Sequence, residues 1–212
     1  MSISKCFLHK ARWVQGIYQA DIDWMMGIYQ HVGHAPYACS VHLETNRYIS
    51  WNNNDQGEQN AAYAYRKPIE YCSFVFSQQT LHYTDIVPVS PQPKHAVIYL
   101  HGGPHNCFMD SYSPVIEKLR DAGLRIIGFN YPGSSGFDYD YRQLIEQDWG
   151  GMDLESLIHL RKTVLGDYTD VYLYGVSYGG YLALLAAGKA SSLWTKVSAC
   201  APFTDLEHLH DT

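Results

Sequence analysis

Residues 170–181 carry the sequence Asp-Val-Tyr-Leu-Tyr-Gly-Val-Ser-Tyr-Gly-Gly-Tyr, which says more about the architecture than any other segment. The run is apolar up to Gly175, continues as Gly-x-Ser-x-Gly around Ser177, and passes into a segment rich in Ala and Leu. This pattern predicts a strand, a sharp turn and a helix, with Ser177 on the turn. Such a turn pushes the serine hydroxyl outwards, and the helix N-terminus directs amide groups at a reacting group. The segment predicts a nucleophile elbow, and a glycine-rich turn that only packs tightly is the alternative.

The segments around this elbow alternate between strand-like and helix-like patterns. Apolar runs predict a strand pair at 70–76 and 81–87 and further strands at 96–100, 124–130 and 196–201. Helices are expected over about 113–122 and over 153–165, and in the second the apolar residues recur at helical spacing. Strands that alternate with helices predict a mostly parallel sheet with helices on both faces, which is an α/β fold.

The first 68 residues differ in composition from the rest of the chain. They are rich in polar and aromatic residues and show no regular hydrophobic pattern. The sequence at 13–19, Trp-Val-Gln-Gly-Ile-Tyr-Gln, recurs at 24–30 as Trp-Met-Met-Gly-Ile-Tyr-Gln. Such aromatic and β-branched runs predict antiparallel strands, residues 51–57 predict a loop, and two copies are too few for a repeat architecture. We therefore expect residues 1–68 to form a small β-rich extension and residues 69–212 to form a partial α/β domain.

The bulk composition excludes several classes of function. The net charge is −6, with 15 basic and 21 acidic residues and no basic run, so nucleic acid is not expected as a partner. The five cysteines are scattered and form no Cys-x-x-Cys, which argues against a disulfide framework or zinc site and favours the cytoplasm. The N-terminus lacks the apolar core of a signal peptide, and no apolar run approaches the ~20 residues of a membrane span.

A serine nucleophile needs a general base, a group that orients the base, and donors for the developing oxyanion. The sequence His-Gly-Gly-Pro at 101–104 directly follows the strand predicted at 96–100. Such a loop can present a backbone amide opposite the elbow, so we expect the amides of Gly103 and Tyr178 to form an oxyanion hole. His101 is expected to be a structural residue of this loop, not the catalytic base.

Four motifs, in this order along the chain, resemble those of the prolyl oligopeptidase family of serine peptidases, with its acylaminoacyl-peptidase and dipeptidyl-peptidase branches nearest. They lie at 101–104, 130–137, 148–153 and 175–181, and the resemblance covers about residues 69–205. It implies an α/β-hydrolase fold and acyl transfer from a peptide, amide or ester to Ser177, with Gly103 and Tyr178 as oxyanion donors. No cofactor or metal is implied, and residues 148–153 are expected to be a structural element without a chemical role.

The sequence also departs from this family. In α/β-hydrolases the acid and the histidine of the triad follow the nucleophile on later loops, whereas this chain stops soon after the sixth predicted strand. The long propeller of the family is absent too. We therefore expect the chain alone to be weakly active or inactive, with a second polypeptide or self-association completing the sheet. A non-catalytic hydrolase-like binding or assembly protein is the main alternative, and an esterase is the weaker one.

Two groups of polar residues elsewhere could be taken for triad members or metal ligands. The C-terminal group is expected to be a polar chain end, because its order and spacing do not fit the triad loops. His31 and His34 are expected to be hairpin or surface histidines, since zinc would need more ligands. The C-terminal group consists of Asp205, Glu207, His208, His210 and Asp211.

Overall fold

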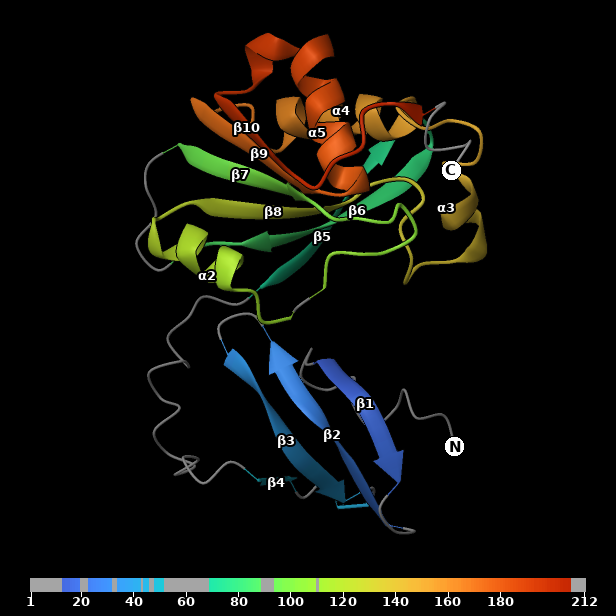
Figure 1. Ribbon diagram of the computed structural model, residues 1–212, viewed down its shortest axis with the longest axis vertical. Helices are drawn as coiled ribbons and strands as arrows, with labels where there is room; N and C mark the ends of the chain where they lie inside the picture. The colour runs from blue at the N-terminus through green and yellow to red at the C-terminus, as the bar shows by residue number, and fades with distance from the viewer. Residues whose placement is uncertain are drawn as a thin grey trace. The chain divides into compact units, whose positions relative to one another are not determined.

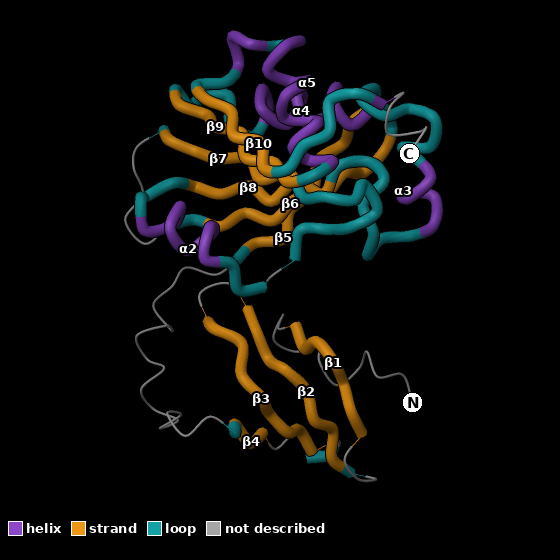
Figure 2. The backbone as a smooth tube through the Cα atoms, in the orientation of Figure 1, coloured by secondary structure: helices purple, strands orange, loops and turns teal. Residues whose placement is uncertain are grey.

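The computed structural model describes residues 13–19, 23–31, 34–42, 44–45, 48–51, 69–88, 94–109 and 111–206 (Figures 1 and 2). The chain forms two units, of which the first comprises residues 1–66 and 109–119 and the second comprises residues 67–108 and 120–212. In the described part of the chain, no helix has the length and apolarity needed to cross a bilayer. We describe each unit by itself.

The first unit contains a four-stranded antiparallel sheet in the order β1-β2-β3-β4. The two similar segments of the sequence form its first two strands, and Trp13 of one lies opposite Gln30 of the other. His31 pairs with His34 across the β2–β3 hairpin. The β-rich character expected for this region is thereby confirmed, whereas the loop expected at 51–57 lies outside the described residues except for Trp51. The strands are β1 (Trp13–Gln19), β2 (Trp24–His31), β3 (His34–His42) and β4 (Tyr48–Ser50).

The second unit is built on a six-stranded sheet in the order β10-β9-β7-β8-β6-β5. The strands from β10 to β8 run parallel, and β6 and β5 continue the sheet antiparallel, which confirms the mostly parallel sheet expected from the sequence. The strands are β5 (Glu70–Phe76), β6 (Gln79–Ile86), β7 (His95–Leu100), β8 (Arg125–Asn130), β9 (Asp170–Val176) and β10 (Lys196–Cys200).

The strand order reverses at β7, and this reversal locates the candidate site. From β7 the chain passes to β8 on one side and later returns to β9 on the other. In open α/β sheets ligands bind outside the carboxyl ends of the strands at such a switch point. The carboxyl ends of β7 and β9 are Leu100 and Val176, so the residues that follow them, His101 and Ser177, leave adjacent strands at this position.

Two long helices bury the apolar residues of the sheet. Helix α5 (Tyr178–Lys189) contacts β7, β9 and β10, while α4 (Met152–Thr163) contacts α5 and β5. Ala183 and Ala186 are fully buried, and their small side chains let α5 lie close to the strands. Leu157 and Leu160 of α4 are also buried in this core, as the helical spacing predicted. Two further short elements are α2 (Pro114–Asp121) and the 3₁₀ turn η3 (Ser191–Leu193).

Helix α3 (Tyr139–Gln143) lies between β8 and α4, in a segment for which the sequence pattern predicts no helix. Asp138 caps this helix, because its Oδ1 accepts a hydrogen bond from the backbone N–H of Tyr141 at 2.8 Å. The hydroxyl of Tyr141 donates to the carbonyl of Asn130 at 2.5 Å and ties the helix to the end of β8. Tertiary bonds of this kind hold a helix that is too short to form alone.

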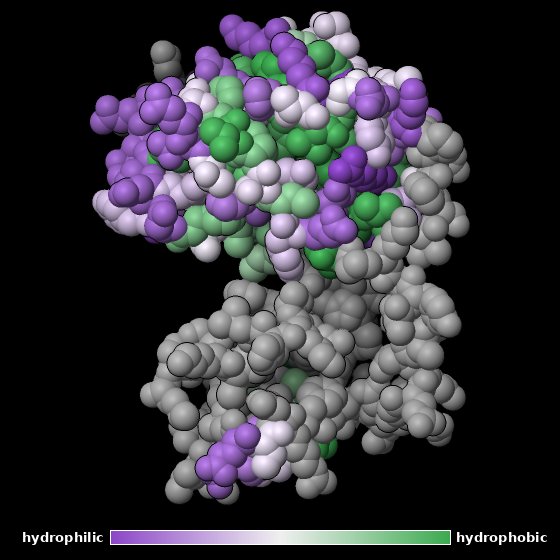
Figure 3. Space-filling view, turned by 180° about the vertical axis from the view of Figure 1, so that it is seen from behind, coloured by the Kyte–Doolittle hydropathy of each residue, from purple (hydrophilic) through white to green (hydrophobic). Residues whose placement is uncertain are grey.

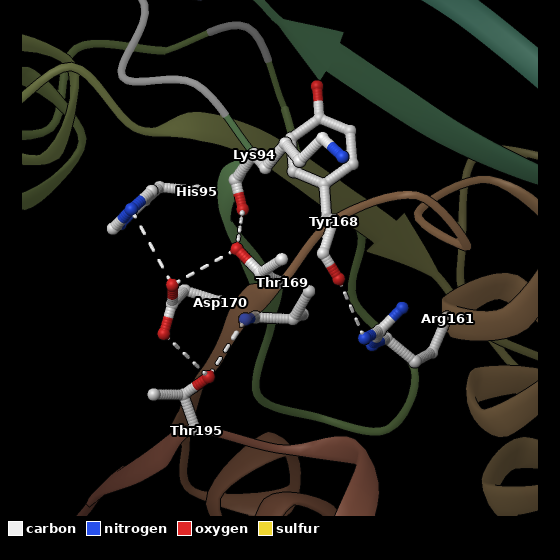
Figure 4. Close-up of polar contacts among 8 residues, drawn as sticks. Lys94, His95, Arg161, Tyr168, Thr169, Asp170 and Thr195 are labelled. Carbon is white, nitrogen blue, oxygen red and sulfur yellow. Dashed lines mark hydrogen bonds and ion pairs between the residues drawn. The ribbon is translucent and has the colours of Figure 1, made fainter.

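The N-terminal ends of β7 and β9 are joined by a polar cluster around Asp170 (Figure 4). Its carboxylate accepts hydrogen bonds from Thr169 Oγ1 at 3.2 Å and from Thr195 Oγ1 at 3.4 Å. His95 Nε2 lies 3.5 Å from the same carboxylate, and Val171 N donates to Thr195 Oγ1 at 3.1 Å. This cluster links β7, β9 and the segment before β10 at the end of the sheet opposite Ser177.

The surface of the second unit, seen from behind, mixes hydrophobic with hydrophilic residues (Figure 3). Tyr71 and Val75 are 60% and 67% exposed, and Tyr139 of α3 is 73% exposed. Tyr71 and Val75 lie on the same face of the edge strand β5, because they are four positions apart and side chains alternate between the two faces of a strand.

Replacing Arg161 with alanine is expected to lower the free energy of unfolding by about 1–2 kcal/mol, because charged hydrogen bonds to carbonyl groups are lost. The guanidinium donates to the carbonyls of Leu165 at 2.5 Å, Leu193 at 3.1 Å and Tyr168 at 3.1 Å, the last of which is drawn in Figure 4. Urea denaturation measures the effect, and the exposed Arg142→Ala variant is the control. Equal losses in the two variants would contradict this role of Arg161.

Candidate active site

Ser177 occupies the turn between β9 and α5 with an unusual backbone conformation. Its φ of 52° and ψ of −117° place a non-glycine residue in a region that L-residues rarely adopt. Its N–H donates to the carbonyl of Cys200 at 2.9 Å, and its carbonyl accepts from the N–H of Tyr181 at 3.0 Å. The side chain is exposed, whereas the residues that follow it are buried. Such strain is typical of functional sites, and here it presents a hydroxyl to solvent.

The two glycines of the motif allow the strand and the helix to approach each other. A Cβ on Gly175 would collide with the carbonyl group of Gly179, and a Cβ on Gly179 would collide with the carbonyl oxygens of Leu100 and His101. All of these atoms belong to backbone, which cannot turn aside as a flexible side chain can. The glycines therefore bring the start of α5 against the end of β7.

The His-Gly-Gly-Pro loop lies directly beside the elbow. A Cβ placed on Gly102 would be 3.3 Å from the Cβ of Ser177, so the loop and the turn are in contact. Gly103 has a φ of 138°, and a Cβ there would lie 2.6 Å from the backbone nitrogen of His105. Glycine is thus required at Gly103 both for its conformation and for space. The structure brings Ser177 and this loop together, as the sequence predicts.

His101 is a buried residue whose side chain fixes the loop. Its Nε2 lies 2.8 Å from Ser134 Oγ and its Nδ1 lies 2.7 Å from the carbonyl oxygen of Gly102. Its ring stacks on Tyr131 with 4.3 Å between centroids, and the Tyr131 hydroxyl donates to the His101 carbonyl at 2.8 Å. Burial lowers the pKa of His101 to about 4, so the ring is neutral at pH 7. These contacts fit the structural role that the sequence suggested for His101.

An aromatic cluster surrounds the first turn of α5. Tyr178 is fully buried and meets Trp149 edge-on at 4.9 Å, while Tyr181 stacks on Phe203 at 5.0 Å. Trp149 itself is 39% exposed. Side chains from two separate segments thus pack against the helix end that begins with Tyr178.

Sequence reasoning missed one polar contact of the site. The Tyr178 hydroxyl donates to Asp153 Oδ2 at 2.5 Å, and Asp153 is fully buried. Burial raises the pKa of the Asp153 carboxyl, which the hydrogen bond from Tyr178 partly offsets. An acidic residue next to Leu154 on the buried face of an amphipathic helix was the available signal, because buried carboxylates need partners.

Among the described side chains, none forms a hydrogen bond with the Ser177 hydroxyl. Within the described part of the chain, Ser177 makes hydrogen bonds through its backbone alone. Asp205 lies within the described residues, but Glu207, His208, His210 and Asp211 lie outside them. Among the described side chains, no group of three or more His, Cys, Asp or Glu residues is arranged to hold a metal ion.

This chain is similar to known proteins in sequence and in fold. The family model described as "Prolyl oligopeptidase family" matches residues 110–212. Acylamino-acid-releasing enzyme 1 of Oryza sativa subsp. japonica is 32% identical over 114 residues, which are 52% of this chain and 15% of that protein. Probable dipeptidyl-peptidase 5 of Aspergillus flavus is 33% identical over 91 residues, which are 40% of this chain and 13% of that protein.

A solved structure supports the fold over a longer stretch. A puromycin-hydrolyzing peptidase of Mycobacterium tuberculosis superimposes with a TM-score of 0.75 at 23% identity, covering 91% of this chain and 31% of that one. This likeness confirms the α/β-hydrolase fold class, and the chain spans less than a third of the length of each of these relatives. The expected family resemblance is confirmed: residues 110–212 match the model of the prolyl oligopeptidase family of serine peptidases.

Proposed function

We propose that this chain carries the nucleophile half of a serine peptidase site, which accepts the acyl group of a peptide, or of a related amide or ester, on Ser177. The observation that carries the proposal is the exposed Ser177 at positive φ, on the strand-to-helix turn beside the His-Gly-Gly-Pro loop. The match of residues 110–212 to the model of a serine peptidase family supports the same chemistry.

In the proposed reaction, Ser177 Oγ attacks the substrate carbonyl and its proton passes to a general base. The carbonyl oxygen gains negative charge and is stabilised by the backbone N–H groups of Gly103 and Tyr178. The amine or alcohol of the substrate then leaves with a proton, and water releases the acyl group from Ser177. No cofactor takes part in these steps.

We further propose that the general base and the acid that orients it come from a second polypeptide or from further residues of a longer protein. The hydrogen bonds of Ser177 in the described residues support this, since they leave its hydroxyl without a base. Without these groups only the oxyanion hole and substrate binding act, which is a small part of the full rate enhancement.

A fluorophosphonate probe tests the proposed nucleophile. We expect slow labelling of the purified chain at Ser177, abolished in Ser177→Ala and retained in the control Ser198→Ala, which changes an exposed serine of β10. Mass spectrometry of the labelled peptide identifies the site. Labelling that survives in Ser177→Ala would refute the nucleophile, and rapid labelling of the isolated chain would refute the incomplete triad.

A non-catalytic binding or assembly role is the second candidate, and it is favoured by the lack of a base at Ser177 in the described residues. The same Ser177→Ala variant separates the two. A binding protein keeps its biological activity when this hydroxyl is removed, whereas a peptidase loses it.

The edges of the six-stranded sheet suggest where a partner attaches. Strand β10 ends the sheet, and Lys196, Ser198 and Cys200 are exposed along it. An edge strand offers unpaired backbone groups to another chain. We expect the purified chain to self-associate or to bind a partner strand there, and expect Ser198→Lys to weaken that association, because charges block edge pairing. Light scattering that finds a stable monomer with and without this substitution would contradict the expectation.

A further inference from the structure

Asp153 is buried in the interior of the second unit, where ionisable side chains are rare. It is fully inaccessible to solvent in the first turn of α4, whereas Glu155 in the same turn is exposed. A carboxylate placed only to favour the helix N-terminus could remain in water, as Glu155 does. Burial of Asp153 is costly unless the group is hydrogen-bonded, so its partners indicate what it does.

The two carboxylate oxygens of Asp153 accept hydrogen bonds from two different helices. Its Oδ1 accepts a hydrogen bond from the N–H of Leu154 at 2.8 Å, which is local to the helix. Its Oδ2 accepts from the Tyr178 hydroxyl at 2.5 Å, which comes from the first residue of α5. Burial raises the pKa of Tyr178, so its hydroxyl remains a donor at neutral pH. The second bond therefore connects α4 to the residue that follows Ser177.

Tyr178 in turn contacts the residue that supports the neighbouring loop. Its ring stacks on Tyr131 with 5.7 Å between centroids. The Tyr131 hydroxyl donates to the carbonyl of His101, which precedes Gly102 and Gly103. A continuous path of contacts thus runs from Asp153 through Tyr178 and Tyr131 to the loop that carries Gly103.

We propose that Asp153 is a positioning residue that holds Tyr178 and, through it, sets the backbone amides of Tyr178 and Gly103 beside Ser177. The proposal rests on the proposed function in taking these two amides as the oxyanion donors. Asp153 touches neither substrate nor reacting atoms. It acts by fixing the side chain of the residue whose own amide lies at the site, and preorganised donors of this kind need rigid support.

The test uses the full chain and compares Asp153→Asn with Glu155→Gln. Asparagine keeps the size of Asp153 and an oxygen for the N–H of Leu154, but an NH2 group, which cannot accept from the Tyr178 hydroxyl, replaces Oδ2. We expect the amide resonances of Tyr178 and Gly103 in two-dimensional NMR spectra to move in Asp153→Asn and to stay in place in Glu155→Gln. Fluorophosphonate labelling of Ser177 should slow about 10- to 100-fold in Asp153→Asn only, the cost of misplacing a catalytic donor.

A second variant keeps the test valid if Asp153→Asn folds poorly. Tyr178→Phe removes the same hydrogen bond and keeps the ring contacts, so it should displace the same two resonances. The double variant should move them no further, because both changes break one interaction. Changes confined to the amides of α4, or none at Tyr178 and Gly103, would overturn the proposal and leave Asp153 as a helix cap.

The two readouts separate this proposal from the proposed function. If the resonances move but the unmodified chain is never labelled, the positioning role stands and the nucleophile assignment fails. If the unmodified chain is labelled at Ser177 and Asp153→Asn is labelled equally fast with unmoved resonances, the nucleophile stands and the positioning role fails.

Discussion

Replacing Gly179 with alanine is expected to lower the free energy of unfolding by about 3 kcal/mol, since the added methyl group overpacks a rigid site. The new Cβ would collide with the carbonyl oxygens of Leu100 and His101 at the end of β7. Relief requires α5 to move away from the sheet, which would also displace Ser177 at its start. In this variant we therefore expect a lower free energy of unfolding in chemical denaturation and a lower rate of fluorophosphonate labelling at Ser177.

The same helix supplies a matched control for this substitution. Gly188 has open space around its Cβ position, so Gly188→Ala should stabilise the protein by about 0.5–1 kcal/mol, through the better helix propensity of alanine. The two variants change the same residue type in the same helix and are expected to have opposite signs. Equal stability of the two proteins would show that the close approach of α5 to β7 does not constrain the elbow.

His101 is expected to make the second unit less stable in mild acid. The pKa of His101 is about 4 in the folded protein, against an ordinary value of 6.5, so below pH 6.5 the unfolded chain binds a proton that the folded chain does not. The stability that the folded protein keeps by burying a neutral His101 is therefore complete above pH 6.5, and it is lost as the pH falls towards 4. From pH 7 to pH 5 we expect a loss of about 2 kcal/mol from this one group.

The matched variant for this effect is His101→Gln, which can still form hydrogen bonds but does not titrate. Urea denaturation at pH 7 and pH 5, followed by intrinsic fluorescence, should show a smaller loss of stability in the variant. Other titrating groups act alike in both proteins and cancel in the comparison. The same pH dependence in the two proteins would contradict the assignment of the effect to His101.

The sequence predicted the parts of this structure that depend on local pattern. The strand, turn and helix around Ser177 were found because apolar runs and glycines report directly on backbone conformation. The neighbouring loop at His101 was also identified, since it follows a strand of the same sheet. The nucleophile and the oxyanion donors Gly103 and Tyr178 stay predictions, as does the domain boundary near residue 68.

Long-range polar contacts could not be predicted in the same way. Helix α3 was missed because the bond from Tyr141 to the carbonyl of Asn130 supports it, and no local pattern reports such a bond. The pairing of Asp153 with Tyr178 joins the first turns of two helices, and the place of Asp153 on a buried helix face indicated that it needs a partner without identifying Tyr178. Sequence periodicity shows that a side chain is buried, but it does not name the partner that makes burial tolerable.

The reversal of strand order at β7 has a consequence for how the site comes into being. The loop at His101 leaves β7, but β9, which delivers Ser177, pairs with β7 only after β8 and α4 have been inserted in the chain. Pairing of distant segments must overcome the entropy of closing a long loop before any contact rewards it. We therefore expect residues on the two sides of the candidate site to meet late in folding, after β9 has paired with β7.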